Sequence, residues 1–181
     1  MELTPAELTV LGLVIEHPHH GYDLEQVIQQ RGIRQWTDIG FSSIYYLLTK
    51  LEQRGLLHVP EAPAAAKSRR VFHATAEGRR VAAATALALL TEARPVPHPM
   101  LVGLANLPLL SARQYARALR TRLAQLDARI AAVRAAQEAQ EAHASLPLAA
   151  REVFSYSLSL MEAERQWLAT RVQVPGDNRQ D

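Results

Sequence analysis

Three prolines within five residues, Pro95, Pro97 and Pro99, divide the 181-residue chain into two parts. Proline lacks a backbone N–H and clashes with the preceding helical turn, so no helix runs through this segment. We therefore expect two domains, residues 1–95 and residues 96–181, each with its own core. The chain contains no cysteine, which excludes disulfides and thiolate metal sites as the means of holding either domain together.

A complete helix start opens the first domain. Thr4 is followed by Pro5 and, three residues after the threonine, by Glu7. In this arrangement threonine caps the helix, proline fits its first turn and glutamate closes a capping box. We expect the helix to end near Glu16, because His17 precedes a proline. Its apolar residues cover nearly the whole circumference, which predicts burial on several sides.

Two further short helices are expected before residue 56. The apolar spacing after Gly21 predicts an amphipathic helix that stops near Gly32. Ser42 and Ser43 offer an N-cap for a third helix, and Gly55 suits the left-handed position at its end. Three short helices in about fifty residues indicate a helix-turn-helix core.

The third helix has two unlike faces, counted at about 100° per residue. The buried stripe consists of Ile44, Leu47, Leu48 and Leu51. The start of the helix and its other face offer hydroxyl, amide and ammonium groups without a carboxylate: Ser42, Ser43, Tyr45, Tyr46, Thr49, Lys50 and Gln53. Such groups bind phosphates and read base edges in a major groove, which accepts an α-helix. The open alternative is that Tyr45 packs on a neighbouring helix.

A basic β-hairpin is expected directly after this helix. Two β-prone runs, residues 56–59 and 69–74, flank a linker rich in proline and alanine, which predicts a loose hairpin. Lys67, Arg69 and Arg70 lie at its tip and on its return strand. There they are placed to contact the phosphate backbone, as the wing of a winged helix does. A fourth helix is expected from Thr75 to Arg94.

The formal charge of +2 conceals an uneven distribution. Residues 1–49 hold six acidic and two basic residues, a net −4, whereas residues 50–80 hold seven basic and three acidic residues, a net +4. A local basic segment favours a polyanion such as DNA as partner. Charge alone leaves a solvated surface open as the alternative. No apolar stretch reaches the roughly 20 residues that span a membrane, so we expect a cytoplasmic protein.

The second domain is expected to consist mainly of two long helices. Ser111 and Gln114 form another capping box, and the apolar residues that follow recur at intervals of three and four, a heptad seam that needs a partner helix. A last helix, from Leu148 to Val172, is apolar on more than one side. We predict that a second copy of the chain packs here, through Leu119, Leu123, Leu126, Ile130, Val133, Phe154, Leu158, Met161, Trp167 and Leu168. The alternative is a hairpin within one chain that has no role in association.

Few residues suit catalysis or metal binding. His17, His19 and His20 form the densest histidine cluster, but proline interrupts it and no cysteine or matching carboxylate pair accompanies it, so we expect no metal site. No glycine-rich phosphate loop, nucleophile elbow or HExxH motif occurs, so we expect neither an enzyme nor a cofactor. Four aromatic residues are candidates for a pocket that takes a planar effector, with core packing as the alternative: Trp36, Phe154, Tyr156 and Trp167.

The order of these elements and several motifs resemble the PadR family of bacterial transcriptional regulators. The motifs are Leu3-Thr4-Pro5, Leu11-Gly12-Leu13, His20-Gly21-Tyr22-Asp23-Leu24, Ser43-Ile44-Tyr45, Gly55-Leu56 and Thr75-Ala76-Glu77-Gly78-Arg79. The resemblance implies a winged helix-turn-helix domain, mainly α with a small β-hairpin, with its recognition helix at residues 42–54 and its wing at residues 56–74. The C-terminal helices resemble the dimerisation domain of the longer subfamily, similar to the virulence-activator C-terminal domain. Tyr46 stands where the family often has proline, which makes it a candidate for sequence preference.

Together these features predict a homodimer that binds an inverted-repeat operator in double-stranded DNA. A repressor is favoured over an activator, and a small aromatic molecule is the candidate effector. A second hypothesis, from another class, is a helical interaction module whose winged domain binds a protein partner and no nucleic acid.

Overall fold

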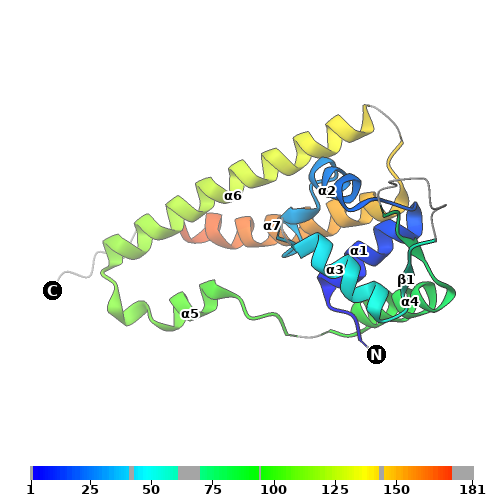
Figure 1. The fold of residues 1–181 in the computed structure, drawn as a ribbon. Helices are drawn as coiled ribbons and strands as arrows, with labels where there is room; N and C mark the ends of the chain where they lie inside the picture. The colour runs from blue at the N-terminus through cyan, green and yellow to red at the C-terminus, as the bar shows by residue number, and fades with distance from the viewer. Residues whose placement is uncertain (1, 41–42, 61–69, 94, 143–144, 173–181) are drawn as a thin grey trace. The chain divides into compact units, whose positions relative to one another are not determined.

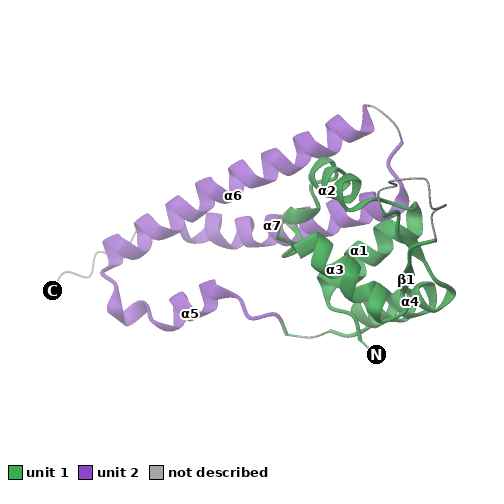
Figure 2. Ribbon diagram, viewed as in Figure 1, with its two compact units in different colours: residues 1–95 green, residues 96–181 purple. Residues whose placement is uncertain are grey.

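The computed structural model describes residues 2–40, 43–60, 70–93, 95–142 and 145–172 (Figure 1). The chain separates into two compact units, residues 1–95 and residues 96–181 (Figure 2). The described elements are helices together with one small antiparallel hairpin. This confirms the predicted fold class, mainly α with a small β-hairpin. No helix in the described part of the chain has the length and apolarity needed to cross a membrane.

The first unit contains four α-helices, a 3₁₀ turn and two short strands among its described residues. These are α1 (Pro5–Glu16), α2 (Gly21–Gln30), η1 (Ile33–Gln35), α3 (Ser43–Gln53), β1 (Leu57–His58), β2 (His73–Ala74) and α4 (Ala76–Thr91). The predicted capping box of α1 is confirmed, because the Thr4 amide donates to Glu7 Oε2 over 2.8 Å and the Glu7 amide donates to Thr4 Oγ1 over 3.2 Å. Helix α1 ends at Glu16, with an extended backbone at the cap residue His17, as expected from the following proline.

Helix α1 lies at the centre of this unit and contacts α3, α4 and β2. Its Val10, Leu11, Leu13 and Val14 are buried, which confirms the prediction from its all-round apolar pattern. The predicted buried stripe of α3 is also confirmed, since Ile44, Leu47, Leu48 and Leu51 are the hydrophobic residues that α3 buries. Full burial of one such side chain contributes about 1.5–3 kcal/mol. Several of them therefore fix the orientation of α3 on α1.

Gly55 ends α3 and turns the chain into the hairpin. Its φ of 69° lies in the left-handed region, as predicted. The Gly55 amide donates to the Glu52 carbonyl over 2.8 Å, and the Leu56 amide donates to the Leu51 carbonyl over 2.9 Å, the two bonds of a Schellman motif. The hairpin is shorter than the sequence predicts. Among the residues described on either side of the 61–69 gap, two pairs form the ladder, Leu57 with Ala74 and His58 with His73.

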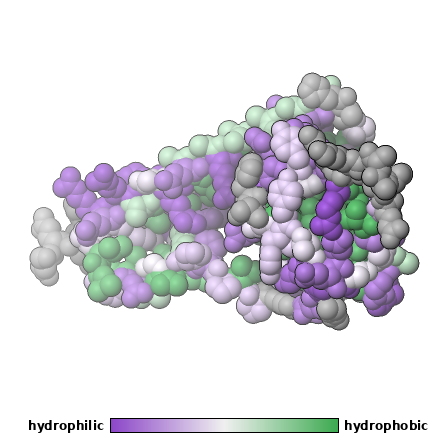
Figure 3. Space-filling model, in the orientation of Figure 1, coloured by the Kyte–Doolittle hydropathy of each residue, from purple (hydrophilic) through white to green (hydrophobic). Residues whose placement is uncertain are grey.

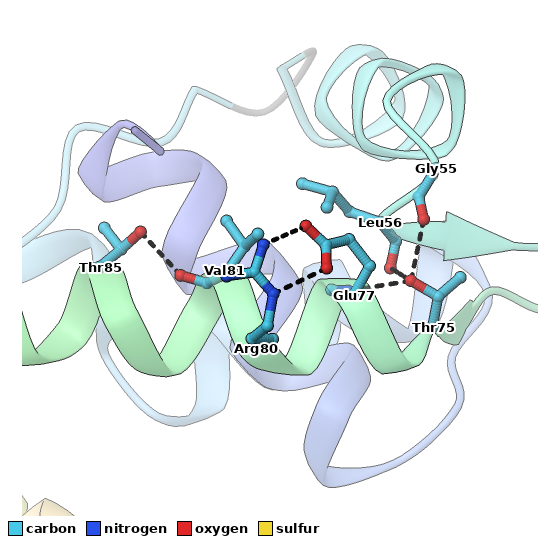
Figure 4. Close-up of polar contacts among 8 residues, drawn as sticks. Gly55, Leu56, Thr75, Glu77, Arg80, Val81 and Thr85 are labelled. Carbon is cyan, nitrogen blue, oxygen red and sulfur yellow. Dashed lines mark hydrogen bonds and ion pairs between the residues drawn. The ribbon is translucent and has the colours of Figure 1, made fainter. Parts of the chain in front are cut away.

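The start of α4 is fastened to the end of α3 (Figure 4). Thr75 Oγ1 donates to the Gly55 carbonyl over 2.8 Å and accepts the Gly78 amide over 2.9 Å. Gly78 allows a close approach of the two backbones, because a Cβ placed there would lie 2.2 Å from the carbonyl oxygen of Leu56. Helix α4 ends at Thr91, short of the predicted Arg94, since Glu92 already has an extended backbone.

The second unit comprises α5 (Pro99–Ala105), the 3₁₀ turn η2 (Leu107–Leu109), α6 (Ala112–Glu141) and α7 (Leu148–Val172). Pro99 does not belong to the helix-free break but starts α5, which proline permits at the first helical position. The predicted capping box of α6 is confirmed. The Ser111 amide donates to Gln114 Oε1 over 2.8 Å, and the Gln114 amide donates to Ser111 Oγ over 3.3 Å.

Helices α6 and α7 form an antiparallel pair within one chain (Figure 1). Three ion pairs join them, Arg122 to Glu164, Arg165 to Asp127 and Arg134 to Glu162, each over 2.5 Å. The core of the pair contains Leu119, Leu126, Ile130 and Leu168, with Leu123, Leu158, Met161 and Trp167 packed against it. Val133 is also buried and Phe154 is half-buried. The seam of α6 therefore has a partner helix in its own chain, and the role of these residues in association stays a prediction.

Candidate nucleic-acid interface

Helix α3 exposes the face that the sequence assigns to DNA. Tyr45 and Tyr46 are 60% and 65% exposed, and Thr49 and Gln53 are exposed as well. Thr49 Oγ1 donates to the Tyr45 carbonyl over 3.0 Å, which leaves its lone pairs and methyl group toward solvent. Ser43 is the first residue of α3 and half-buried. Ser42 lies outside the described residues.

Tyr45 has a second contact that sequence reasoning left as an alternative. A Cβ placed on Gly21 would lie 2.4 Å from Cε1 of Tyr45, so the ring packs directly over the first residue of α2. Tyr45 therefore joins α2 to α3 while most of its surface stays exposed. This close approach gives Gly21 a physical role that spacing alone does not reveal.

Lys50 of α3 and Arg54, the residue that follows α3, both bind the buried carboxylate of Glu7. Lys50 Nζ lies 2.9 Å and Arg54 Nη1 3.0 Å from Glu7 Oε1. Burial raises the pKa of the Glu7 carboxyl, but the Thr4 amide, Lys50 and Arg54 outweigh that effect and hold the pKa at about 2. The sequence identified Glu7 only as a helix-capping residue. The role of Glu7 as the ion-pair partner of Lys50 and Arg54 depends on residues more than forty positions away in the sequence.

The return side of the hairpin also carries a paired cation. Arg70 Nη2 lies 2.6 and 2.5 Å from the two carboxylate oxygens of Glu52 on α3, and its guanidinium lies 5.1 Å from the centroid of the Phe72 ring. Arg70 is thus exposed but held beside α3. Lys67 and Arg69, the other two cations predicted for the wing, lie outside the described residues.

Most of the basic residues described in the segment 50–80 form ion pairs within the fold. Arg80 binds Glu77 on the same helix over 2.5 Å (Figure 4) and lowers the pKa of that carboxyl. Arg79 donates to the Ile15 carbonyl over 3.4 Å. Four of the five basic residues described in this segment therefore have a carboxylate partner, namely Lys50, Arg54, Arg70 and Arg80. Glu52 and Glu77 already count in the net charge of this segment, so the fold adds one further negative charge, that of Glu7.

The histidine cluster fastens the hairpin to the loop before α2. The Phe72 amide donates to the His19 carbonyl over 3.0 Å, and His20 Nδ1 lies 3.1 Å from the carbonyl oxygen of Arg70. Burial lowers the pKa of His19. In the part of the chain that the structure describes, no three histidine, aspartate or glutamate side chains gather as metal ligands would.

The second unit contains an apolar groove of about 510 Å³ between α5 and α7. Its lining consists of His98, Met100, Leu101, Leu104, Leu160, Met161, Ala163, Glu164 and Trp167. Glu164 is the carboxylate that accepts Arg122 Nε over 2.5 Å. Of the four aromatic residues predicted for an effector pocket, Trp167 lines this groove, while Trp36, half exposed, belongs to the first unit.

Comparisons with known proteins identify one family model and several solved structures that are similar to this chain. Residues 10–84 match the model of the transcriptional regulator PadR-like family, and no curated protein matches the chain. Two similar structures are Bacillus subtilis PadR in complex with operator DNA and with p-coumaric acid. Both have a TM-score of 0.74, at 18% and 16% identity, and they cover 95% and 92% of this chain and 98% and 95% of theirs.

The Vibrio cholerae virulence activator AphA is also similar, with a TM-score of 0.68 and 18% identity over 92% of this chain and 95% of its own. At these identities the likeness establishes the fold, including the C-terminal helices of the longer members. The motifs at Gly21, Tyr45, Gly55 and Gly78 occupy the positions where the backbone of this fold turns or approaches closely. The sequence of residues 10–84 is therefore similar to the PadR-like family of transcriptional regulators, and the fold of the chain is similar to that of the solved structures.

Proposed function

We propose that this protein is a sequence-specific DNA-binding regulator that inserts α3 into the major groove and rests its wing on the phosphate backbone. The observation that carries the proposal is the exposed face of α3, where Tyr46, Thr49 and Gln53 stand opposite the buried stripe. Hydroxyl and amide groups on such a helix read base edges. The similar Bacillus subtilis protein bound to operator DNA supports the same use of the fold.

A homodimer on an inverted repeat is the form of binding that we propose. Helix-turn-helix proteins generally bind two half-sites about 34–36 Å apart, and two copies supply the two recognition helices. Apolar side chains in the second unit support association, and hydrophobic residues gather over α5 (Figure 3). The large exposed ones on α5, η2 and α7 are Leu101, Val102, Leu109, Leu148, Val153, Tyr156 and Leu160. These residues add to the predicted dimerisation residues of α6 and α7 a surface that a second copy would cover.

The proposed role is repression, relieved by a small aromatic molecule. The groove lined by Met100, Met161 and Trp167 has the size and apolar character of a ligand pocket. The complex of Bacillus subtilis PadR with p-coumaric acid makes phenolic acids the first compounds to test. A chain that binds the chromosome in this way works in the cytoplasm.

Gel retardation of the chain's own promoter fragment tests DNA binding. We expect a shift at low salt that fades as salt rises, since released counterions drive the association. No shift with this or any other fragment would favour the interaction module that binds a protein instead. Tryptophan fluorescence titrated with phenolic acids tests the effector. A Trp36→Phe variant keeps only the signal of Trp167, and a flat response in it would contradict the groove as the effector site.

A further inference from the structure

We infer that Glu7 is a positioning residue for DNA binding, which holds Lys50 and Arg54 on the flank of α3 so that the helix meets DNA with a neutral face. Lys50 then contacts no phosphate, although its place on an exposed recognition helix suggests that it would. The inference rests on the proposed DNA-binding function. It specifies which side chains of α3 contact DNA.

The Glu7 carboxylate is fully engaged by donors from the chain itself. Its side chain is 1% exposed. Oε2 accepts the Thr4 amide over 2.8 Å, while Oε1 lies 2.9 Å from Lys50 Nζ and 3.0 Å from Arg54 Nη1. Arg54 is 14% exposed and Lys50 is 41% exposed. Glu7 is thus a buried anion that faces one cation of α3 and one cation directly after its end.

The angular positions of Lys50 and Arg54 around the axis of α3 determine which charged groups lie on its exposed face. At about 100° per residue, Lys50 and Arg54 lie on one flank, whereas Tyr46 and Gln53 lie opposite the buried stripe. The other flank holds Glu52, which binds Arg70. The charges on both flanks are therefore held in ion pairs within the fold, with two cations on the one carboxylate of Glu7 and one pair at Glu52, and the centre of the exposed face carries no charge.

Lys50 stays beside Glu7 because breaking this ion pair is unfavourable. If its ammonium moved to a phosphate, a buried carboxylate would lose one of its two cations, which is unfavourable in a site closed to water. A solvent-exposed ion pair with phosphate returns little in exchange. If the charge of Glu7 is removed, however, the half-exposed Lys50 side chain is free to turn outward.

The dependence of binding on salt measures this directly. The logarithm of the association constant falls with the logarithm of salt by about 0.9 for each phosphate neutralised. We would measure this slope by fluorescence anisotropy on the labelled promoter fragment, with the full-length chain and its variants. Lys50→Met should leave the slope unchanged, Glu7→Gln should steepen it by about 0.9, and the double variant should return it to the wild-type value.

Thr49→Lys provides the matched control. It adds a cation at the exposed face of α3, so its slope should steepen by about 0.9 if that face meets DNA. A wild-type chain that does not bind, or a Thr49→Lys slope equal to the wild type, would overturn the proposed function and this inference with it.

A slope that flattens by about 0.9 in Lys50→Met would overturn the inference alone, because Lys50 would then contact phosphate. Circular dichroism checks the fold of each variant first. If Glu7→Gln does not fold, Lys50→Met still decides, since it keeps the pair between Glu7 and Arg54. An unchanged slope in that variant supports the inference and a flatter one refutes it.

Discussion

The buried carboxylate of Glu7 makes the stability of the first unit depend on pH. Its pKa falls from the ordinary 4.5 to about 2 in the fold, so the folded state favours the ionised form. The contribution is fully present above pH 4.5 and disappears as the pH falls toward 2. The difference between the two pKa values corresponds to about 3 kcal/mol of unfolding free energy, of which about 2 kcal/mol is lost between pH 5 and pH 3.

Comparison with Glu7→Gln isolates this contribution from that of other carboxylates. Glutamine still accepts the Thr4 amide but leaves the mostly buried Arg54 guanidinium without its anion. Removing one partner of a buried pair destabilises by about 3–5 kcal/mol, so we expect a loss near the lower end at pH 7, where Lys50 is free to seek solvent.

Urea unfolding followed by circular dichroism provides the measurement, at one protein concentration because association also stabilises the fold. Between pH 5 and pH 3 the wild type should lose about 2 kcal/mol more than Glu7→Gln, since the variant has no proton to gain at this position. The two stability curves should therefore converge on acidification. A gap that stays constant from pH 7 to pH 3 would refute the assigned pairing of Glu7 with Lys50 and Arg54.

Four further substitutions test the fold, the reading face and the second unit. Gly78→Ala should destabilise by about 1–3 kcal/mol in thermal unfolding, because its Cβ would meet the backbone oxygen of Leu56 at 2.2 Å. Gly12→Ala, the matched control with nothing within 4 Å of its Cβ, should stabilise α1 by up to about 1 kcal/mol. Gln53→Ala should cost about 1–3 kcal/mol on the preferred operator and relax preference at one base pair, measured with single-base variants of the fragment. Leu160→Ser, at a residue 56% exposed, should weaken dimerisation in sedimentation without lowering the melting temperature, and a fall in melting temperature alone would place Leu160 in the hairpin core.

Helix ends were predictable from sequence because their chemistry is local. The capping boxes at Thr4 and Ser111 each need a partner three residues away, and both form. The left-handed turn at Gly55 likewise depends on the two or three residues beside it. The buried stripe of α3 follows from a period of 3.6 residues, which a short window of sequence reveals.

Contacts between distant residues were not predictable in this way. Gly21 lies against Tyr45 and Gly78 lies against Leu56, and in both pairs a missing side chain on one element makes room for another. The identity of glycine signals that some constraint exists. It does not say which atom occupies the space, because that depends on how the helices pack.

The second unit illustrates a related limit. The heptad spacing of α6 correctly indicates one buried face, and Leu119, Leu126 and Ile130 are buried. The heptad period, however, indicates that one face of the helix is buried. It does not indicate which helix packs against that face. Here α7 of the same chain does so, which leaves exposed side chains outside the seam, such as Tyr156 and Leu160, as a further candidate surface for a second copy.

Charge along the sequence has the same limit, with a consequence for recognition. A net +4 over residues 50–80 already includes Glu52, which binds Arg70, but it does not include Glu7, which the fold brings to Lys50 and Arg54. Attraction to phosphate varies steeply with salt and hardly with sequence, whereas hydrogen bonds to base edges discriminate between sites. A recognition helix whose cations are held by internal carboxylates keeps its hydrogen bonds to base edges. It loses much of its attraction to phosphate. Its discrimination between operator and other DNA then depends on neutral groups, and persists at salt concentrations that weaken non-specific binding.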